Sequence, residues 1–78
     1  MKLHEKLLFY INAHGIKQTW LAEQLNISVK TLNAILRGRQ RLAADMFEQI
    51  CRNGLKVSPS IFFDNKFLET KKTGTEGR

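Results

Sequence analysis

Residues 18–37 read QTWLAEQLNISVKTLNAILR, and the architecture that we expect for the chain follows mainly from this segment. Apolar residues at helical spacing occur in both of its halves: Leu21, Ala22 and Leu25 in the first, and Leu32, Ile35 and Leu36 in the second. Ser28 precedes the second pattern and is a good N-cap, because its side-chain oxygen can accept a hydrogen bond from a free backbone N–H. Gly38 suits the end of that helix, since glycine adopts the left-handed conformation at little cost. The segment therefore predicts two short consecutive helices.

Three further helical patterns flank this segment. The first consists of Leu3, Leu7, Leu8 and Ile11 and ends at Gly15. The second consists of Met46, Phe47, Ile50 and Cys51 and ends near Gly54. The third covers residues 59–69, with Ser58 as its N-cap and Pro59 as its first residue. No window shows the alternation that a strand requires. We therefore expect an all-α fold: one compact domain of five helices over residues 1–69, followed by a flexible, disordered basic tail over residues 70–78. Each helix alone is too short to be stable in water, so packing of the apolar faces must hold them together.

The composition narrows the possible functions. A chain of 78 residues suffices for one small domain, which excludes a large catalytic domain with a deep pocket and a second lobe. Thirteen lysines and arginines against seven acidic residues give a net charge of +6, which favours a polyanionic partner. No apolar run approaches the roughly 20 residues of a membrane helix, and a single cysteine excludes an intrachain disulfide. We expect a soluble cytoplasmic protein with no membrane segment.

The basic charge is concentrated in residues 17–41. This part of the chain has five basic residues and one acidic residue, a net charge of +4. In its second helix one face is apolar, and the opposite face presents Lys30, Asn33, Ala34 and Arg37. From a helix in the major groove, asparagine can pair with adenine, and lysine or arginine with guanine. An ordinary solvated helix face would look much the same, so this face alone leaves both interpretations open.

The segment as a whole resembles the helix-turn-helix of phage repressor and Cro-type regulators, also called xenobiotic-response-element-like regulators. In that motif a small residue, here Ala22, lies where the two helices cross, and Ile27 fills the turn. Position 26 takes a left-handed conformation, for which asparagine is the most tolerant residue after glycine. Other stretches that resemble the family are residues 14–16, 37–39 and 55–59, so the likeness covers roughly residues 3–64. It implies a five-helix domain, usually dimeric, that binds operator DNA and controls transcription.

The resemblance also implies which residues contact DNA. The positions that match base-reading residues are Val29, Lys30, Asn33 and Ala34, and those expected at or beside phosphates are Gln18, Thr19, Ser28, Arg37, Arg39 and Arg41. Lys17 departs from the family, which commonly has a serine or threonine N-cap there, so the first helix of the motif starts less firmly. Val29 and Ala34 can contact only a thymine methyl. Base readout therefore rests mainly on Lys30 and Asn33, supplemented by DNA shape.

The last predicted helix has more apolar side chains than a small core needs. They are Phe62, Phe63, Phe67 and Leu68. We interpret them as a self-complementary dimer interface, because exposed apolar patches mark partners and a dimer supplies a second recognition helix about 34 Å away. The alternative is that Ile61 and one phenylalanine complete the core while the others are simply exposed.

The remaining residues with reactive or ligating side chains favour structural roles. His4, His14 and Cys51 lack the spacing of metal ligands, and a buried Cys51 without a histidine partner is inert. We therefore expect no metal, no cofactor and no enzymatic activity. Trp20 is expected to pack partly on a neighbouring helix rather than to stack on a base.

The leading hypothesis is a sequence-specific regulator of transcription, a repressor that binds a palindromic operator as a homodimer. The sequence does not distinguish repression from activation through contact with a polymerase. A rival of a different class is a protein-interaction module, such as an antitoxin or antirepressor, whose aromatic C-terminal helix grips a protein partner.

Overall fold

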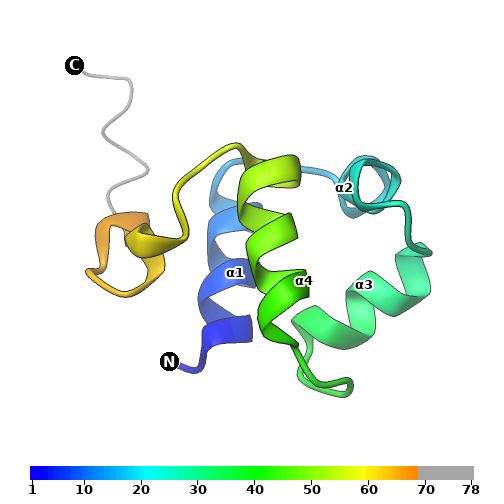
Figure 1. Ribbon diagram of the computed structural model, residues 1–78, viewed down its shortest axis with the longest axis horizontal. Helices are drawn as coiled ribbons and strands as arrows, with labels where there is room; N and C mark the ends of the chain where they lie inside the picture. Colours follow the sequence, from blue (N-terminus) through cyan, green and yellow to red (C-terminus); the bar gives the residue numbers. More distant parts are fainter. Residues whose placement is uncertain (69–78) are drawn as a thin grey trace.

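The computed structural model describes residues 1–68, and within them every regular element is helical (Figure 1). The elements are α1 Leu3–Ala13, α2 Gln18–Leu25, α3 Val29–Leu36, α4 Ala44–Gln49, the π-helical segment η1 Ile50–Leu55 and the 3-10 helix η2 Pro59–Phe62. The all-α class is therefore confirmed, with four α-helices in place of five. The tail expected over residues 70–78 lies outside the described residues.

The elements are arranged around one core with two distinct ends. The segment α2 packs against both α3 and η1, and α1 packs against α3 and η2. In Figure 1, α2 and α3 form one end of the part of the chain that is described, while η2 and residues 63–68 form the other. The outer side of α3 is left open to solvent.

A single hydrophobic core joins these elements. Its buried members are Leu7 and Ile11 of α1, Leu21, Ala22 and Leu25 of α2, Leu32 and Leu36 of α3, Phe47 of α4, Ile50 and Cys51 of η1, and Phe62 and Phe67. The apolar faces expected for the first four helices are thus the faces that are buried. Since α2 and α3 have only eight residues each, these core contacts are what stabilise them.

The fourth helical pattern ends near Gly54, as predicted, but its last turn is wider than an α-helix. The backbone N–H of Val57 donates to the carbonyl of Cys51 at 2.8 Å, and Lys56 has a left-handed conformation with φ 61°. Gly54 is buried, and a Cβ at this position would overlap the Leu21 side chain of α2. Glycine therefore permits the close approach of η1 to α2.

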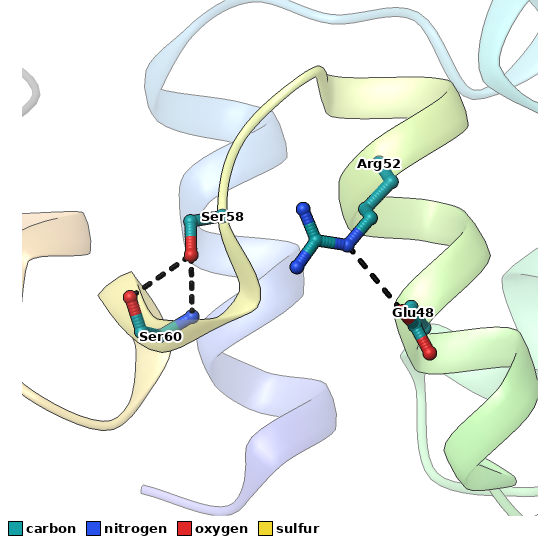
Figure 2. A network of polar contacts seen from close by, with 4 residues as sticks. All are labelled: Glu48, Arg52, Ser58 and Ser60. Carbon is teal, nitrogen blue, oxygen red and sulfur yellow. Dashed lines mark hydrogen bonds and ion pairs between the residues drawn. The ribbon is translucent and has the colours of Figure 1, made fainter.

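The last helix, expected over residues 59–69, is not formed as one helix within the described residues. The Oγ of Ser58 caps η2: it accepts from the backbone N–H of Ser60 at 3.3 Å and lies 3.0 Å from the Ser60 hydroxyl (Figure 2). After η2 the chain turns through Asn65, which has φ 66°, into a second short 3-10 turn at residues 66–68. The predicted cap is confirmed, but the helix it begins is only four residues long.

This path buries two of the four residues expected in a dimer interface. Phe62 is 0% exposed and Phe67 is 1% exposed. The prediction that these two rings face a partner is therefore wrong, because they complete the core of their own chain. Phe63, at 67% exposed, and Leu68, at 48%, remain accessible.

Aromatic packing and one hydrogen bond hold the C-terminal end in place. The ring of Phe62 lies 5.6 Å from that of Phe67 and packs edge-on against the rings of Tyr10 and Phe47. The Nζ of Lys6 donates to the backbone carbonyl of Phe62 at 2.8 Å. This end is therefore attached to α1 by contacts between residues far apart in the sequence.

Candidate nucleic-acid interface

The connection between α2 and α3 is set by two capping residues. Asn26 ends α2 in the left-handed conformation, with φ 59° and ψ 43°, and Ser28 begins α3. The Oγ of Ser28 accepts from the backbone N–H of Thr31 at 3.0 Å and contacts the Thr31 hydroxyl at 2.9 Å. Both expectations for this turn are confirmed. Lys17 caps α2 without a side-chain hydrogen bond, as expected from its departure from serine or threonine.

Side-chain packing fixes the two helices relative to each other. Leu21 and Ala22 of α2 and Leu32 of α3 are at most 2% exposed, and Ile27 of the turn packs against the core. The small side chain of Ala22 allows the helices to approach. Because one face of α3 packs on the core, residues of its opposite face such as Val29 and Lys30 are exposed to solvent.

The predicted DNA-contacting residues belong to α2, the turn before α3, α3 itself and the loop after it, and they differ in exposure. Those that are exposed are Thr19, Ser28, Val29, Lys30, Arg37, Arg39 and Arg41, and those that are partly buried are Gln18, Asn33 and Ala34. Val29 is an apolar side chain that is 39% exposed. Trp20 is 45% exposed, so it packs only in part.

Three of the predicted residues contact one another. The Nδ2 of Asn33 donates to Oε1 of Gln18 at 3.3 Å, and Nη2 of Arg39 donates to Oδ1 of Asn33 at 2.9 Å. This chain of hydrogen bonds links the start of α2, the middle of α3 and the loop after α3. From the sequence, these three residues were expected to make separate contacts with DNA. Nothing in the sequence indicated hydrogen bonds between them.

The backbone of the loop explains how Arg39 returns to α3. Gly38 has φ 80°, and a Cβ there would lie 2.6 Å from Nε2 of His4. The backbone N–H groups of Arg39 and Gln40 both donate to the carbonyl of Ala34, at 2.9 and 3.1 Å. The loop therefore folds back along the last turn of α3. In the sequence, this path of the loop is marked by Gly38, which was predicted only to end the helix.

The segment that contains α2, α3 and the following loop, residues 17–41, has a net charge of +4. The only ion pair among the described residues joins Arg52 to Glu48 at 3.4 Å, on the exposed side of α4 and η1 (Figure 2). None of the five basic residues between positions 17 and 41 takes part in it. Cations that are not paired within the protein can neutralise phosphates and release the counterions of DNA.

The surroundings of Cys51 and of the other possible ligands can also be described within residues 1–68. Burial raises the pKa of the Cys51 thiol to about 11, so this residue stays protonated and unreactive at neutral pH. Within that part of the chain, no group of three histidine, cysteine or acidic side chains is placed to hold a metal ion. No pocket is present there either, and none of these helices is long and apolar enough to cross a membrane.

A comparison with protein families matches residues 9–62 to the helix-turn-helix model. The chain belongs to the helix-turn-helix family. Cro-type and phage repressors are typical members of this family. Its members are DNA-binding regulators and not generally enzymes. The match places α2 and α3 of this helix-turn-helix protein within a DNA-binding domain. No curated protein and no solved structure matches the chain.

Proposed function

We propose that this helix-turn-helix protein is a sequence-specific transcriptional repressor that binds a palindromic operator as a homodimer. The observation that carries the proposal is the arrangement at α3: Lys30 is exposed there, and the Asn33 amide contacts Arg39 in a loop with three exposed arginines. A helix that fits the major groove with such side chains can read base edges while the arginines bind phosphates. Steric occupation of a promoter then represses transcription.

Within this proposal the side chains of α3 divide into two roles. Lys30 pairs with guanine, and Asn33 pairs with adenine through its amide. Val29 and Ala34 offer only apolar contact, which suits thymine methyl groups. The residues assigned to the phosphates are Gln18, Thr19, Ser28, Arg37, Arg39 and Arg41. Each copy of the protein makes few base contacts. A second copy therefore matters, because two half-sites multiply the discrimination between DNA sequences.

The proposed dimer uses the apolar surface that the fold leaves exposed at the C-terminal end. The ring of Phe63 lies edge-to-face with that of Phe47, with centroids 5.8 Å apart, yet Phe63 remains 67% exposed. Leu68 is 48% exposed nearby in sequence. Such residues favour contact with a second copy. A regulator of this kind acts where the DNA is, and we assign it to the cytoplasm.

Selection from a random double-stranded DNA pool with the purified protein, at about 150 mM salt, tests the proposal. We expect enrichment of an inverted repeat whose half-sites are about one helical turn apart, roughly 34 Å. Retention of DNA without an enriched sequence would contradict sequence-specific repression. Absence of retention would favour a protein-interaction module of the antitoxin or antirepressor type, for which Phe63 is the surface to test.

A further inference from the structure

The hydrogen bond from Arg39 to Asn33 connects a loop residue to a base-reading side chain. We propose that Arg39 is a positioning residue for base specificity: it holds the Asn33 amide in the orientation that pairs with adenine. The proposal rests on the proposed function, in which α3 reads the major groove. It assigns to Arg39 an effect on which base is preferred, in addition to any contact with a phosphate.

An asparagine amide has two ends of similar shape and opposite hydrogen-bonding character. Its oxygen only accepts and its NH2 group only donates, so a half-turn about the last side-chain bond exchanges an acceptor for a donor. In the major groove adenine presents the N6 donor beside the N7 acceptor. Only one of the two orientations of Asn33 therefore matches adenine.

Arg39 selects between these orientations because a guanidinium has five N–H donors and no acceptor. Its Nη2 lies 2.9 Å from Oδ1 of Asn33, and rotation of the amide would place the NH2 group there, donor against donor. Gln18 contacts the other end of the amide at 3.3 Å but cannot select, since its own amide can rotate to match either atom. The orientation is set by Arg39 and followed by Gln18.

The two hydrogen bonds leave Asn33 able to bind a base. An amide oxygen has two lone pairs and an NH2 group has two hydrogens. Arg39 uses one lone pair of Asn33 and Gln18 uses one hydrogen. One acceptor site and one donor remain, which is the combination that adenine N6 and N7 require.

The backbone holds Arg39 where it can do this before DNA arrives. The carbonyl of Ala34 accepts from the N–H groups of both Arg39 and Gln40, and His4 lies against Gly38. These contacts fix the Cα of Arg39 relative to α3, and Arg39 follows Asn33 by six residues in the sequence. A prepositioned side chain loses less conformational entropy when the complex forms.

Arg41 provides a matched control. It is an exposed arginine of the same loop and forms no side-chain hydrogen bond within residues 1–68. If Arg39 served only a phosphate, replacing either arginine would weaken binding to all sequences alike and reduce the dependence on salt. The positioning role predicts a difference between the two replacements.

The experiment measures binding to the selected operator and to all its single-base-pair variants, at two salt concentrations. The proteins are the wild type, N33A, R39A, R41A and the double variant N33A/R39A. We expect R41A to weaken every site by a similar factor. We expect R39A also to lower discrimination about three- to tenfold at the base pair where N33A lowers it, and at no other. At that base pair, the double variant N33A/R39A should show no further loss of discrimination relative to N33A alone.

Two outcomes overturn the proposal while leaving the proposed function intact. In one, R39A ranks the variants as the wild type does and so behaves like R41A. In the other, R39A changes the preference at a base pair that N33A does not affect, which would make Arg39 a direct reader. If the wild type selects no sequence, or if N33A leaves the ranking unchanged, the proposed reading face itself is wrong.

A measurement on the free protein tests the positioning role of Arg39 separately from the proposed binding to DNA. The side-chain NH2 group of Asn33 gives its own pair of signals in a ¹H–¹⁵N NMR spectrum, and its order parameter reports how firmly the amide is held. We expect this order parameter to fall in R39A and to stay unchanged in R41A. An unchanged value in R39A would refute positioning without reference to DNA.

Discussion

The two ends of the molecule are shaped by interactions of different range. At the end formed by α2 and α3, residues close in sequence decide the geometry: Asn26 takes the left-handed turn and Ser28 caps the next helix. At the other end, η2 is four residues long, and the rings of Phe62 and Phe67 are placed by contacts with α1 and α4. The first end therefore depends on local caps and close helix packing, and the second depends on aromatic closure of the core.

The largest effect is expected from Phe62→Ala at the aromatic end. This fully buried ring contacts three other aromatic rings, so its loss leaves a cavity and should lower the free energy of unfolding by about 3–5 kcal/mol. Urea denaturation followed by circular dichroism measures it. Phe63→Ala is the matched control, expected to cost less than about 1 kcal/mol because the ring is mostly exposed. Equal losses would show that exposed aromatic surface contributes as much as the core.

A smaller loss is expected from Gly54→Ala, which tests close packing at the opposite end. The added methyl group would overlap the Leu21 side chain of α2, so η1 or Leu21 must shift. We expect the free energy of unfolding to fall by about 1–3 kcal/mol, and DNA affinity to fall with it because α2 supports α3. Gly15→Ala is a useful comparison, since nothing lies within 4 Å of a Cβ there and only its positive φ is strained. An unchanged stability in Gly54→Ala would mean that the contact is loose.

The two serine caps allow a direct comparison of the ends. Ser28→Ala removes a 3.0 Å hydrogen bond to the first turn of α3 and should lower the free energy of unfolding by about 1 kcal/mol. Ser58→Ala removes a longer bond of 3.3 Å at a four-residue helix, so its effect should be smaller. Thermal unfolding of both variants in parallel measures the difference. A larger effect at Ser58 would contradict the view that local caps matter most at the α2–α3 end.

The smallest effect is expected from Glu48→Gln. The ion pair with Arg52 has side chains that are 64% and 58% exposed, so water screens it, and its loss should change stability by about 0.5 kcal/mol or less. The difference between Glu48→Gln and the wild type should shrink further at 1 M salt. A loss that persists at high salt would indicate a role for Glu48 beyond the ion pair.

The difference between the ends also explains what could be predicted from the sequence. The cap at Ser28 and the buried faces of α2 and α3 were predicted from local spacing and residue chemistry. The left-handed turn at Asn26 was predicted from the resemblance to the helix-turn-helix motif. Local rules did not reveal the fate of the C-terminal rings. A run with several phenylalanines fits either a helix with an exposed apolar face or two short turns that bury alternate rings, and only packing against α1 decides.

The candidate site was predictable in its members but not in its internal contacts. The charge and spacing of α3 indicated Lys30 and Asn33 and the loop arginines. The hydrogen bonds of Asn33 depend on the distance between α2 and α3 and on the way the loop folds back after Gly38. These are properties of the tertiary structure, so no pattern in the sequence contained them.

The hydrogen bond between Lys6 and Phe62 has a consequence for the order of folding. It joins residues 56 positions apart, whereas the contacts that shape α2 and α3 lie within one short segment. Closing a long loop costs more chain entropy than closing a short one, so we expect α2 and α3 to associate early and the aromatic end to dock late. Replacements at the aromatic end should then mainly speed unfolding, while those at the crossing of α2 and α3 should mainly slow folding.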